Sequence, residues 1–190
     1  MRVLSAGTPT LALLLVGAAA LTAAAAPTRA DPRREAAIGT EFLATLRVPT
    51  DPPQVIAPDL ATYNVPAHRA GYLRGPRING KPVPPCADWV TVLPAGKNLH
   101  TDVRCTIRTG DGSLVYVEYR GAFAWNDAAR AKCQAGGPLN GSELYFRIQP
   151  RFRARAGRYS WLNGVVAVGE MTALKCGEGS YTEYDIYLVK

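Results

Sequence analysis

The sequence predicts an all-β protein built as a single antiparallel β-barrel of about eight strands. Segments of alternating apolar and polar residues follow one another along most of the chain, and Gly, Pro, Asn or Asp bounds most of them. One eight-residue segment, 127–134, favours a helix and is short enough to be a turn or two within a loop insertion. Many short strands without alternating helices are typical of a closed barrel or a sandwich.

The first predicted strand spans residues 38–48, where apolar side chains fall on one side and polar side chains on the other. Prolines then punctuate residues 49–66, and their density predicts an irregular surface segment rather than ladder strands. Residues 71–80 hold a short strand broken by glycines. The later strands are predicted at 89–93, 99–109, 113–125, 144–153, 159–162, 165–174 and 181–189.

Asp111-Gly112 separates two alternating runs and predicts a two-residue type I′ hairpin loop. Such a loop pairs residues whose numbers sum to 223. Opposed residues share a face of the sheet, so Asp102 and Arg104 would share one with Gly121 and Tyr119. Neither face of this hairpin is then wholly apolar, which favours a barrel with a polar spot in its lumen over a sandwich.

Residues 1–30 predict a secretory signal peptide. A charged start at Arg2 precedes an apolar centre from Leu11 to Ala26, and small residues follow at the exit. This apolar centre is shorter than the ~20 residues of a membrane span, which argues against the alternative of an uncleaved anchor. We therefore expect residues 31–190 to form one β-barrel domain that is secreted or extracytoplasmic and has no stable membrane anchor.

Basic residues outnumber acidic ones in the chain, with 22 Lys and Arg against 15 Asp and Glu. Such a balance raises nucleic acid as a partner. However, the basic residues are scattered singly, and Arg151 and Arg153 alternate with Phe152 and Ala154 as the exposed face of a strand would. The sequence therefore predicts no nucleic-acid partner, and the oligomeric state stays open.

The predicted mature part contains four cysteines: Cys86, Cys105, Cys133 and Cys176. An even number in an exported chain predicts two disulfides, for which three connectivities are possible. A zinc site is the competing use, but it needs paired C-x-x-C or His spacings. These cysteines stand 19, 28 and 43 residues apart, so we expect no metal.

The candidate catalytic residues are four charged side chains: Asp88, Asp102, Arg104 and Arg147. Asp102 and Arg104 stand two residues apart on a predicted strand, so they project the same way with room for a small polar ligand between them. Arg holds a carboxylate or enolate by a planar two-point contact, and a carboxylate beside apolar walls can act as general acid or base. A structural ion pair explains the same pattern, and nothing local separates the two.

The candidate ligand contacts are aromatic and amide side chains. Trp89 follows Asp88, which suits packing of an aromatic or alicyclic ligand against an acid or base, although a core Trp beside a turn Asp fits equally well. Tyr145 shares the strand face of Arg147, and Asn163 either closes a turn or supplies an amide at the barrel mouth. The full set of predicted ligand contacts is Trp89, Tyr119, Tyr145, Phe152, Trp161 and Asn163.

Several enzyme classes lack their motifs in this sequence. There is no G-x-S-x-G, no unpaired cysteine by count and no histidine in a recognisable base position, which disfavours covalent hydrolase chemistry. Phosphate loops and dinucleotide fingerprints are missing too, because no glycine cluster follows a strand and opens a helix. We therefore expect no cofactor.

A series of short motifs, taken in order, resembles the family catalogued as domain of unknown function 3237, and the resemblance covers residues 38–190. It implies a small antiparallel barrel with a ligand-sized interior, lipocalin-like or allene-oxide-cyclase-like, found mostly in bacteria and fungi and mostly without an assigned activity. A cyclase, isomerase or lyase role is what the resemblance suggests by analogy. The motifs are A-D-W at 87–89, D-V-R at 102–104, T-G-D-G at 109–112, Gly121, Y-F-R at 145–147, Phe152 and Y-S-W-L-N at 159–163.

Two departures from the family pattern both install cysteine. Cys86 stands where the pattern usually has Gly before A-D-W, and Cys105 stands where it has an aromatic residue after D-x-R. Set against the resemblance, these changes imply the pairs Cys86–Cys105 and, by remainder, Cys133–Cys176.

The sequence thus suggests a secreted small-molecule-binding β-barrel, with a cofactor-independent isomerase, cyclase or lyase activity on a small anionic or enolisable compound. A non-catalytic ligand carrier and a cell-surface interaction module are the alternatives. The first two functions require Asp102, Arg104 and Arg147 to converge on one enclosed cavity, whereas the third leaves them exposed, or paired with no void beside them.

Overall fold

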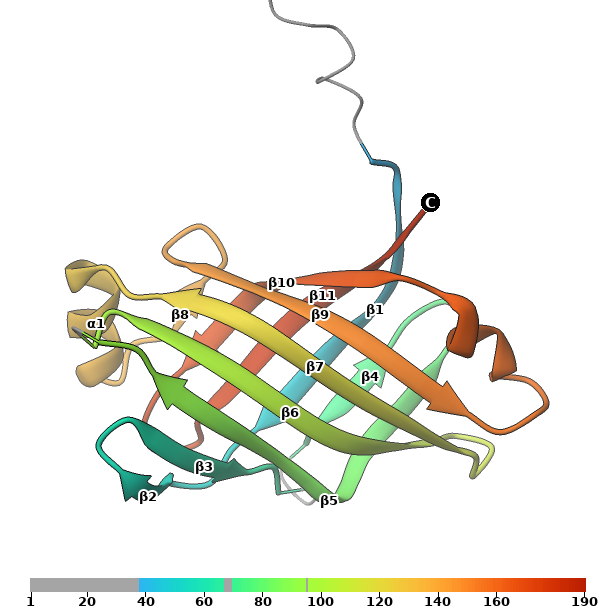
Figure 1. Cartoon of the computed structure of the whole chain (residues 1–190), viewed down its shortest axis with the longest axis horizontal. Helices are drawn as coiled ribbons and strands as arrows, with labels where there is room; N and C mark the ends of the chain where they lie inside the picture. The colour runs from blue at the N-terminus through green and yellow to red at the C-terminus, as the bar shows by residue number, and fades with distance from the viewer. Residues whose placement is uncertain (1–37, 67–69, 95) are drawn as a thin grey trace, which may run out of the picture. The chain divides into compact units, whose positions relative to one another are not determined.

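The strands of this chain close into a barrel (Figure 1). The computed structural model describes residues 38–66, 70–94 and 96–190, so the predicted signal peptide at 1–30 lies outside the described residues. The elements of the described part are β1 (Thr40–Pro49), β2 (Gln54–Ala57), β3 (Leu60–Asn64), β4 (Tyr72–Arg74), β5 (Asn79–Val92), β6 (Asn98–Thr109), β7 (Leu114–Ala124), α1 (Asp127–Gln134), β8 (Leu139–Asn140), β9 (Tyr145–Ala154), the 3-10 helix η2 (Ser160–Gly164), β10 (Ala167–Lys175) and β11 (Tyr181–Val189).

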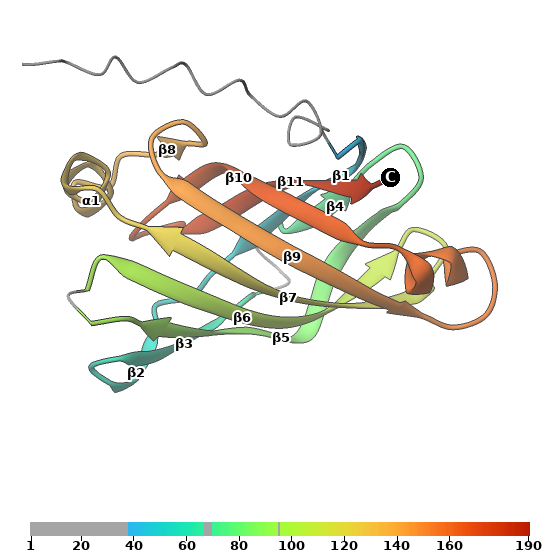
Figure 2. The same cartoon turned by 45° about the horizontal axis from the view of Figure 1, so that its top comes forward.

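Eight antiparallel strands form the closed ring, which can be followed in a second view (Figure 2). Around the ring, β1, β4, β5, β6, β7, β9, β10 and β11 pair in this order, and β11 returns to β1. The pair β2–β3 is attached to the second half of β5 and extends the wall there. The prediction of a single antiparallel barrel of about eight strands is confirmed.

The inward side chains of the ring pack together as the core. On β6, for example, Val103 is buried whereas its neighbour Arg104 is exposed, as the two-residue period of a strand requires. The Phe146 ring lies edge-on against both Phe123 and Tyr184, with ring centroids 5.0 and 5.2 Å apart. Burying each such side chain stabilises the fold by ~1.5–3 kcal/mol relative to its exposed state.

The β6–β7 hairpin differs from its prediction by one residue. Its loop has three residues, 110–112, because Thr109 N–H donates to Ser113 O at 2.9 Å and Gly112 takes a positive φ of 82°. The Asp111 side chain, which accepts hydrogen bonds from the Thr109 hydroxyl and the Ser113 N–H, holds this turn. Paired residues therefore sum to 222, not 223, so each residue of β6 shares its face with the β7 residue one position earlier than predicted.

The corrected register separates a polar outer face from an apolar inner face. On the outside, Asp102 lies opposite Arg120, and Arg104 lies opposite Glu118. The inward positions of both strands are apolar next to the turn, where Val115, Val117, Cys105 and Ile107 are buried. The predicted mixture of charged and apolar groups on each face is therefore wrong.

Of the other predicted elements, the helix is confirmed, whereas the proline-rich segment and residues 159–162 differ from their predictions. The helix at 127–134 is confirmed as α1, and the Asn126 side chain caps it by accepting the Ala129 N–H at 2.8 Å. The proline-rich segment is less irregular than predicted, because it contains β2 and β3. Residues 159–162 were predicted as a strand, but they belong to η2 and its N-terminal neighbour.

Two disulfides tie the barrel together, in the pairs that the family resemblance implied. Cys86 and Cys105 are directly opposed on β5 and β6, and their bond lies inside the barrel wall. Cys133 and Cys176 join α1 to the turn that precedes β11. Each bridge is worth ~2–4 kcal/mol by constraining the unfolded chain. Among the described residues, no helix is long and apolar enough to cross a membrane.

Candidate functional site

Asp88 points into the barrel from β5 and marks the candidate site. Backbone pairing between β5 and β6 runs through Asp88–Val103 and resumes at Thr91–His100. Between these two pairs, Asp88 Oδ1 accepts the backbone N–H of Asp102 at 3.0 Å. The Asp102 N–H thus bonds to the Asp88 side chain instead of to a backbone carbonyl of β5. This hydrogen bond holds the carboxylate in place where the backbone pairing of β5 and β6 is interrupted.

Burial raises the pKa of the Asp88 carboxyl to about 6, because the cavity around it disfavours the charged form. The Thr101 hydroxyl and the Asp102 N–H oppose that rise, while the charge of the Asp102 carboxylate adds to it. The Thr101 Oγ1 lies near Asp88 but completes no well-formed hydrogen bond within the described residues. A buried hydroxyl without a partner is unusual in a folded protein, and Thr101 lies in the wall of the cavity described next.

A cavity of about 640 Å³ lies in front of Asp88, at the end of the barrel where β7 runs towards α1. This volume is within the usual range for small-molecule sites. The inner part of the cavity is walled mainly by apolar side chains, and its mouth is formed by the segment after β1 and the β10–β11 turn. Its apolar and aromatic lining residues include Val65, Val90, Leu99, Val103, Phe123, Trp125, Phe146 and Leu174.

Three tyrosines share this cavity with Asp88. Tyr63, Asp88, Val103 and Tyr119 are directly opposed across β3, β5, β6 and β7, so they form one row on the lumen side. Tyr184 approaches from β11, and its ring lies 5.7 Å from the ring of Tyr119.

The phenol groups of these tyrosines keep their protons. Burial raises the pKa of Tyr119 and Tyr184 well above the usual value and raises that of Tyr63, and the charge of Asp88 contributes to all three shifts. Tyrosine hydroxyls with raised pKa values remain hydrogen-bond donors at neutral pH. The cavity therefore contains one group, Asp88, that can both accept and donate a proton. It also contains neutral hydroxyl donors that could stabilise negative charge on a bound molecule.

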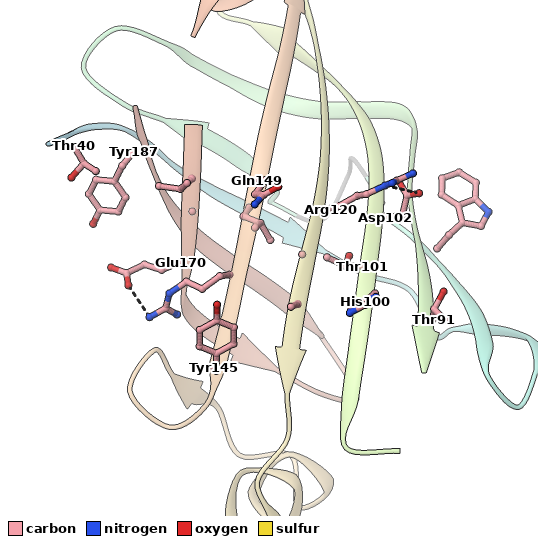
Figure 3. Close-up of a pocket in the computed structure, with 17 residues that line it drawn as sticks. Thr40, Thr91, His100, Thr101, Asp102, Arg120, Tyr145, Gln149, Glu170 and Tyr187 are labelled. Atoms are coloured by element: carbon pink, nitrogen blue, oxygen red, sulfur yellow. Dashed lines mark ion pairs between the residues drawn. The ribbon is translucent and has the colours of Figure 1, made fainter. Parts of the chain in front are cut away.

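A second depression, which we call the outer groove, lies on the outside of the barrel (Figure 3). Its volume is about 940 Å³, and outward side chains of the ring line most of it. Two ion pairs lie within it: Arg147 Nη2 is 3.3 Å from Glu170 Oε2, and Arg120 Nε is 3.6 Å from Asp102 Oδ2. Dashed lines mark ion pairs at Glu170 and between Arg120 and Asp102 in Figure 3.

The four predicted catalytic residues do not converge on one cavity, so the condition stated above for an enzyme or carrier that uses Asp102, Arg104 and Arg147 is not met, and only Asp88 remains as a lumen candidate. Asp88 lies in the lumen, whereas Asp102 and Arg147 line the outer groove. Arg104 also points outward, with Nη2 3.4 Å from Asp102 Oδ2 and its guanidinium 5.3 Å from the centroid of the Trp89 ring. This division follows from the strand period, because Asp102 and Arg104 occupy the even positions of β6 and the odd positions face the core.

The predicted ligand contacts are dispersed in the same way. Tyr119 lines the lumen cavity, and Trp89 and Tyr145 line the outer groove. Phe152 is a buried core residue, and Trp161 belongs to η2. The Asn163 side chain closes the turn after β9, since it accepts the N–H of Ala154 at 2.8 Å and donates to its carbonyl at 2.9 Å.

Sequence reasoning missed Tyr63, Tyr184 and Thr101. Tyr184 alternates with Ile186 and Leu188 on β11, and this inward pattern was available in the sequence. Tyr63 fell in the proline-rich segment, where no strand was predicted. For metals, no group of three or more His, Cys, Asp or Glu side chains suited to hold an ion occurs within residues 38–66, 70–94 and 96–190.

Curated relatives of this chain are themselves uncharacterised. It is 30% identical over 99 residues to a UPF0311 protein from Rhodopseudomonas palustris, a match that covers 52% of this chain and 64% of that protein. The chain thus spans less than two thirds of the length of this relative.

Solved structures share the fold. A conserved protein of unknown function from Rhodopseudomonas palustris has a TM-score of 0.70 at 22% identity, covering 81% of this chain and 98% of that one. A β-barrel-like protein from Acinetobacter baumannii has a TM-score of 0.64 at 26% identity, with 81% and 97% covered. An enzyme from Penicillium herquei has a TM-score of 0.52 at 19% identity, with 80% and 95% covered.

The family model described as protein of unknown function (DUF3237) matches residues 38–189 of this chain. The match takes in every strand of the barrel, the lumen cavity and the outer groove. This chain therefore belongs to the DUF3237 family.

Proposed function

We propose that the lumen cavity binds a small enolisable carbonyl compound and that Asp88 transfers a proton on it, as a cofactor-independent isomerase, cyclase or lyase. One observation supports this proposal most. A carboxyl group with a pKa of about 6 faces a largely apolar cavity together with protonated phenols. A pKa close to the working pH suits a group that must both accept and donate a proton.

In the proposed reaction, the Asp88 carboxylate removes a proton from the carbon next to the carbonyl group. The electron pair of that C–H bond forms a C=C bond, and the carbonyl oxygen takes up the negative charge. Tyr119 is the candidate donor to this oxygen, and Tyr184 supports it by donating a hydrogen bond from its own hydroxyl to Tyr119. An Asp base combined with a Tyr donor stabilises an enolate in other enzymes. Where the compound carries a second C=C bond next to the α-carbon, the enolate is conjugated with it, and protonated Asp88 returns the proton to the far (γ) carbon, so that the double bond moves next to the carbonyl group and the isomerisation is complete.

The charge of the cavity favours a neutral ligand. Its described lining contains a single cation, Lys175, and three carboxyl groups, Asp51, Asp88 and Glu178. Arg104 and Arg147 lie on the outside of the barrel and do not line this cavity, so they are not available to hold the oxygen of a ligand bound there. Of the two classes of compound suggested by the sequence, the cavity therefore fits an enolisable compound and does not fit an anionic one.

A carrier without turnover is the second candidate. The aromatic wall that Phe123, Trp125 and Phe146 form would hold an apolar ligand without any chemistry at Asp88. Carrier and enzyme differ in what happens to the ligand's acidic protons, so this difference is the one to measure.

The experiment follows deuterium exchange at the α-carbons of 2-tetralone, an uncharged bicyclic ketone, in D₂O by NMR. We expect the wild-type protein to accelerate exchange and Asp88→Asn to lower the protein-catalysed rate at least ~100-fold, with little change in Kd. Asp127→Asn is the matched control, because that carboxyl group is exposed at the start of α1 and lines neither the cavity nor the outer groove. Binding of 2-tetralone without exchange would support the carrier instead.

A further inference from the structure

The outer groove crosses the strands of the barrel instead of following one of them. Its lining comes from β5, β6, β7, β9, β10, β11 and the start of β1. The labelled side chains spread across the sheet from Thr91 and Asp102 at one side to Tyr187 and Thr40 at the other (Figure 3). Five of the eight steps around the ring, from β5 to β11, correspond to ~24 Å along the curved outer surface, which suits a long ligand that follows the curvature of the barrel rather than a compact one.

The floor of the groove is formed by small residues, including Gly121, Ala122 and Gly169. At Gly121 even a methyl group would lie 2.7 Å from the Arg147 carbonyl oxygen, so backbone and side chains are closely packed beneath the groove. A ligand in the groove therefore lies directly against the outer surface of the sheet.

Aromatic side chains stand at both sides of the groove and are unusually exposed. Trp89 is 39% exposed and Tyr145 is 56% exposed, and Tyr187 lies at the other side. Large aromatic side chains usually become buried, so their exposure around one groove indicates a binding surface. An exposed aromatic face offers a flat apolar platform beside polar groups.

The charges in the groove cancel one another. Its described lining contains two arginines, Arg120 and Arg147, and two carboxylates, Asp102 and Glu170, and each arginine is paired with a carboxylate within 3.6 Å. The pairs hold planar donors and acceptors in fixed orientations without net charge. A polyanion would have to displace these carboxylates, and an apolar peptide would leave the charged groups without solvent.

We propose that the outer groove binds a neutral oligosaccharide along its length. Sugar rings present apolar C–H faces that stack on aromatic side chains, while their hydroxyls both donate and accept hydrogen bonds. Trp89 and Tyr145 supply the platforms through the ring faces that their arginine neighbours do not cover, since Arg104 lies 5.3 Å from the centroid of the Trp89 ring and Arg147 lies 5.1 Å from that of Tyr145. The paired side chains Arg147 and Glu170 supply a donor and an acceptor to the hydroxyls. This site is separate from the lumen site, so each proposal stands or fails alone.

The test uses three neutral hexasaccharides as probes: cellohexaose, maltohexaose and chitohexaose. We expect at least one of them to bind in isothermal titration calorimetry. Its affinity should exceed that of the corresponding disaccharide, because a longer chain occupies more of the groove. Trp89→Ala and Tyr145→Ala should each weaken binding at least ~10-fold, and both side chains are exposed enough to be removed without unfolding the barrel.

Two variants serve as controls. Tyr116→Ala removes an aromatic side chain from the same outer face of β7 but outside the groove, and Asp88→Asn alters only the lumen. Both should bind the hexasaccharide like the wild type. As a second readout, the bound sugar should shift the backbone amide NMR signals of Ala122 and Gly169. The proposal is overturned if none of the three probes binds at millimolar concentration, or if a probe binds equally well without Trp89 and Tyr145.

Discussion

Replacing Asp88 with Asn should remove a pH dependence from the folding stability. The carboxyl has a pKa of about 6 in the folded protein, compared with 3.8 for an ordinary Asp. Because the folded state binds this proton more tightly than the unfolded state, the stability that it contributes is complete below about pH 4 and is lost as the pH rises through about 6.

The size of the effect follows from the two pKa values. Their difference corresponds to about 3 kcal/mol, at ~1.36 kcal/mol for each pKa unit. The amide that replaces the carboxyl avoids this cost, and its oxygen can still accept the Asp102 N–H that Asp88 accepts at 3.0 Å. The stability advantage of Asp88→Asn over the wild type should therefore be near zero at about pH 4 and reach about 3 kcal/mol at about pH 8.

Guanidinium denaturation of both proteins, with the disulfides intact, measures this difference at a series of pH values. An NMR titration of the Asp88 carboxyl carbon in the wild type, with a midpoint near 6, gives an independent value for the same pKa. A stability difference that stays constant from about pH 4 to about pH 8 would refute the conclusion that burial in the lumen raises this pKa.

Three further substitutions test contacts that stabilise the barrel, and denaturant unfolding measures the effect of each on the free energy of unfolding. Replacing both Cys86 and Cys105 with Ser should lower the free energy of unfolding by ~2–4 kcal/mol, because the unfolded chain loses a cross-link. Gly121→Ala should destabilise the barrel by ~1–3 kcal/mol, since the new methyl group would lie 2.7 Å from a carbonyl oxygen of β9. Asn163→Ala should cost ~1–3 kcal/mol through the loss of both hydrogen bonds to the Ala154 backbone; no change would mean that water replaces them fully.

The fold class could be predicted because period-two patterns and turn residues are local properties of the sequence. The β6–β7 register could not, because Asp111-Gly112 fits both a two-residue loop and the second and third positions of a three-residue loop. Only the Thr109–Ser113 hydrogen bond and the Asp111 side chain decide between them. The one-residue difference places Asp102 and Arg104 on one face with Arg120 and Glu118 instead of Gly121 and Tyr119, and the burial pattern of β6 shows that this face lies outside.

The candidate site was predictable only in part for a related reason. Asp88 was chosen for its place beside Trp89, and it does face a cavity, but its partners come from strands far apart in the sequence. Tyr63 and Tyr184 meet it only because β3 pairs with β5 and because the barrel closes β11 onto β1. Such contacts depend on closure of the whole ring, which no local pattern in the chain specifies.

Asp88 is a costly residue for the fold, and this cost bears on its function. An uncharged side chain of the same shape would keep the Asp102 hydrogen bond and avoid the burial of a charge, so stability alone does not account for a carboxyl group here. The same region also leaves a cavity of about 640 Å³ unfilled by side chains, where close packing would favour a smaller void. The coincidence of these two destabilising features at one place supports the proposal that the lumen cavity is a functional site.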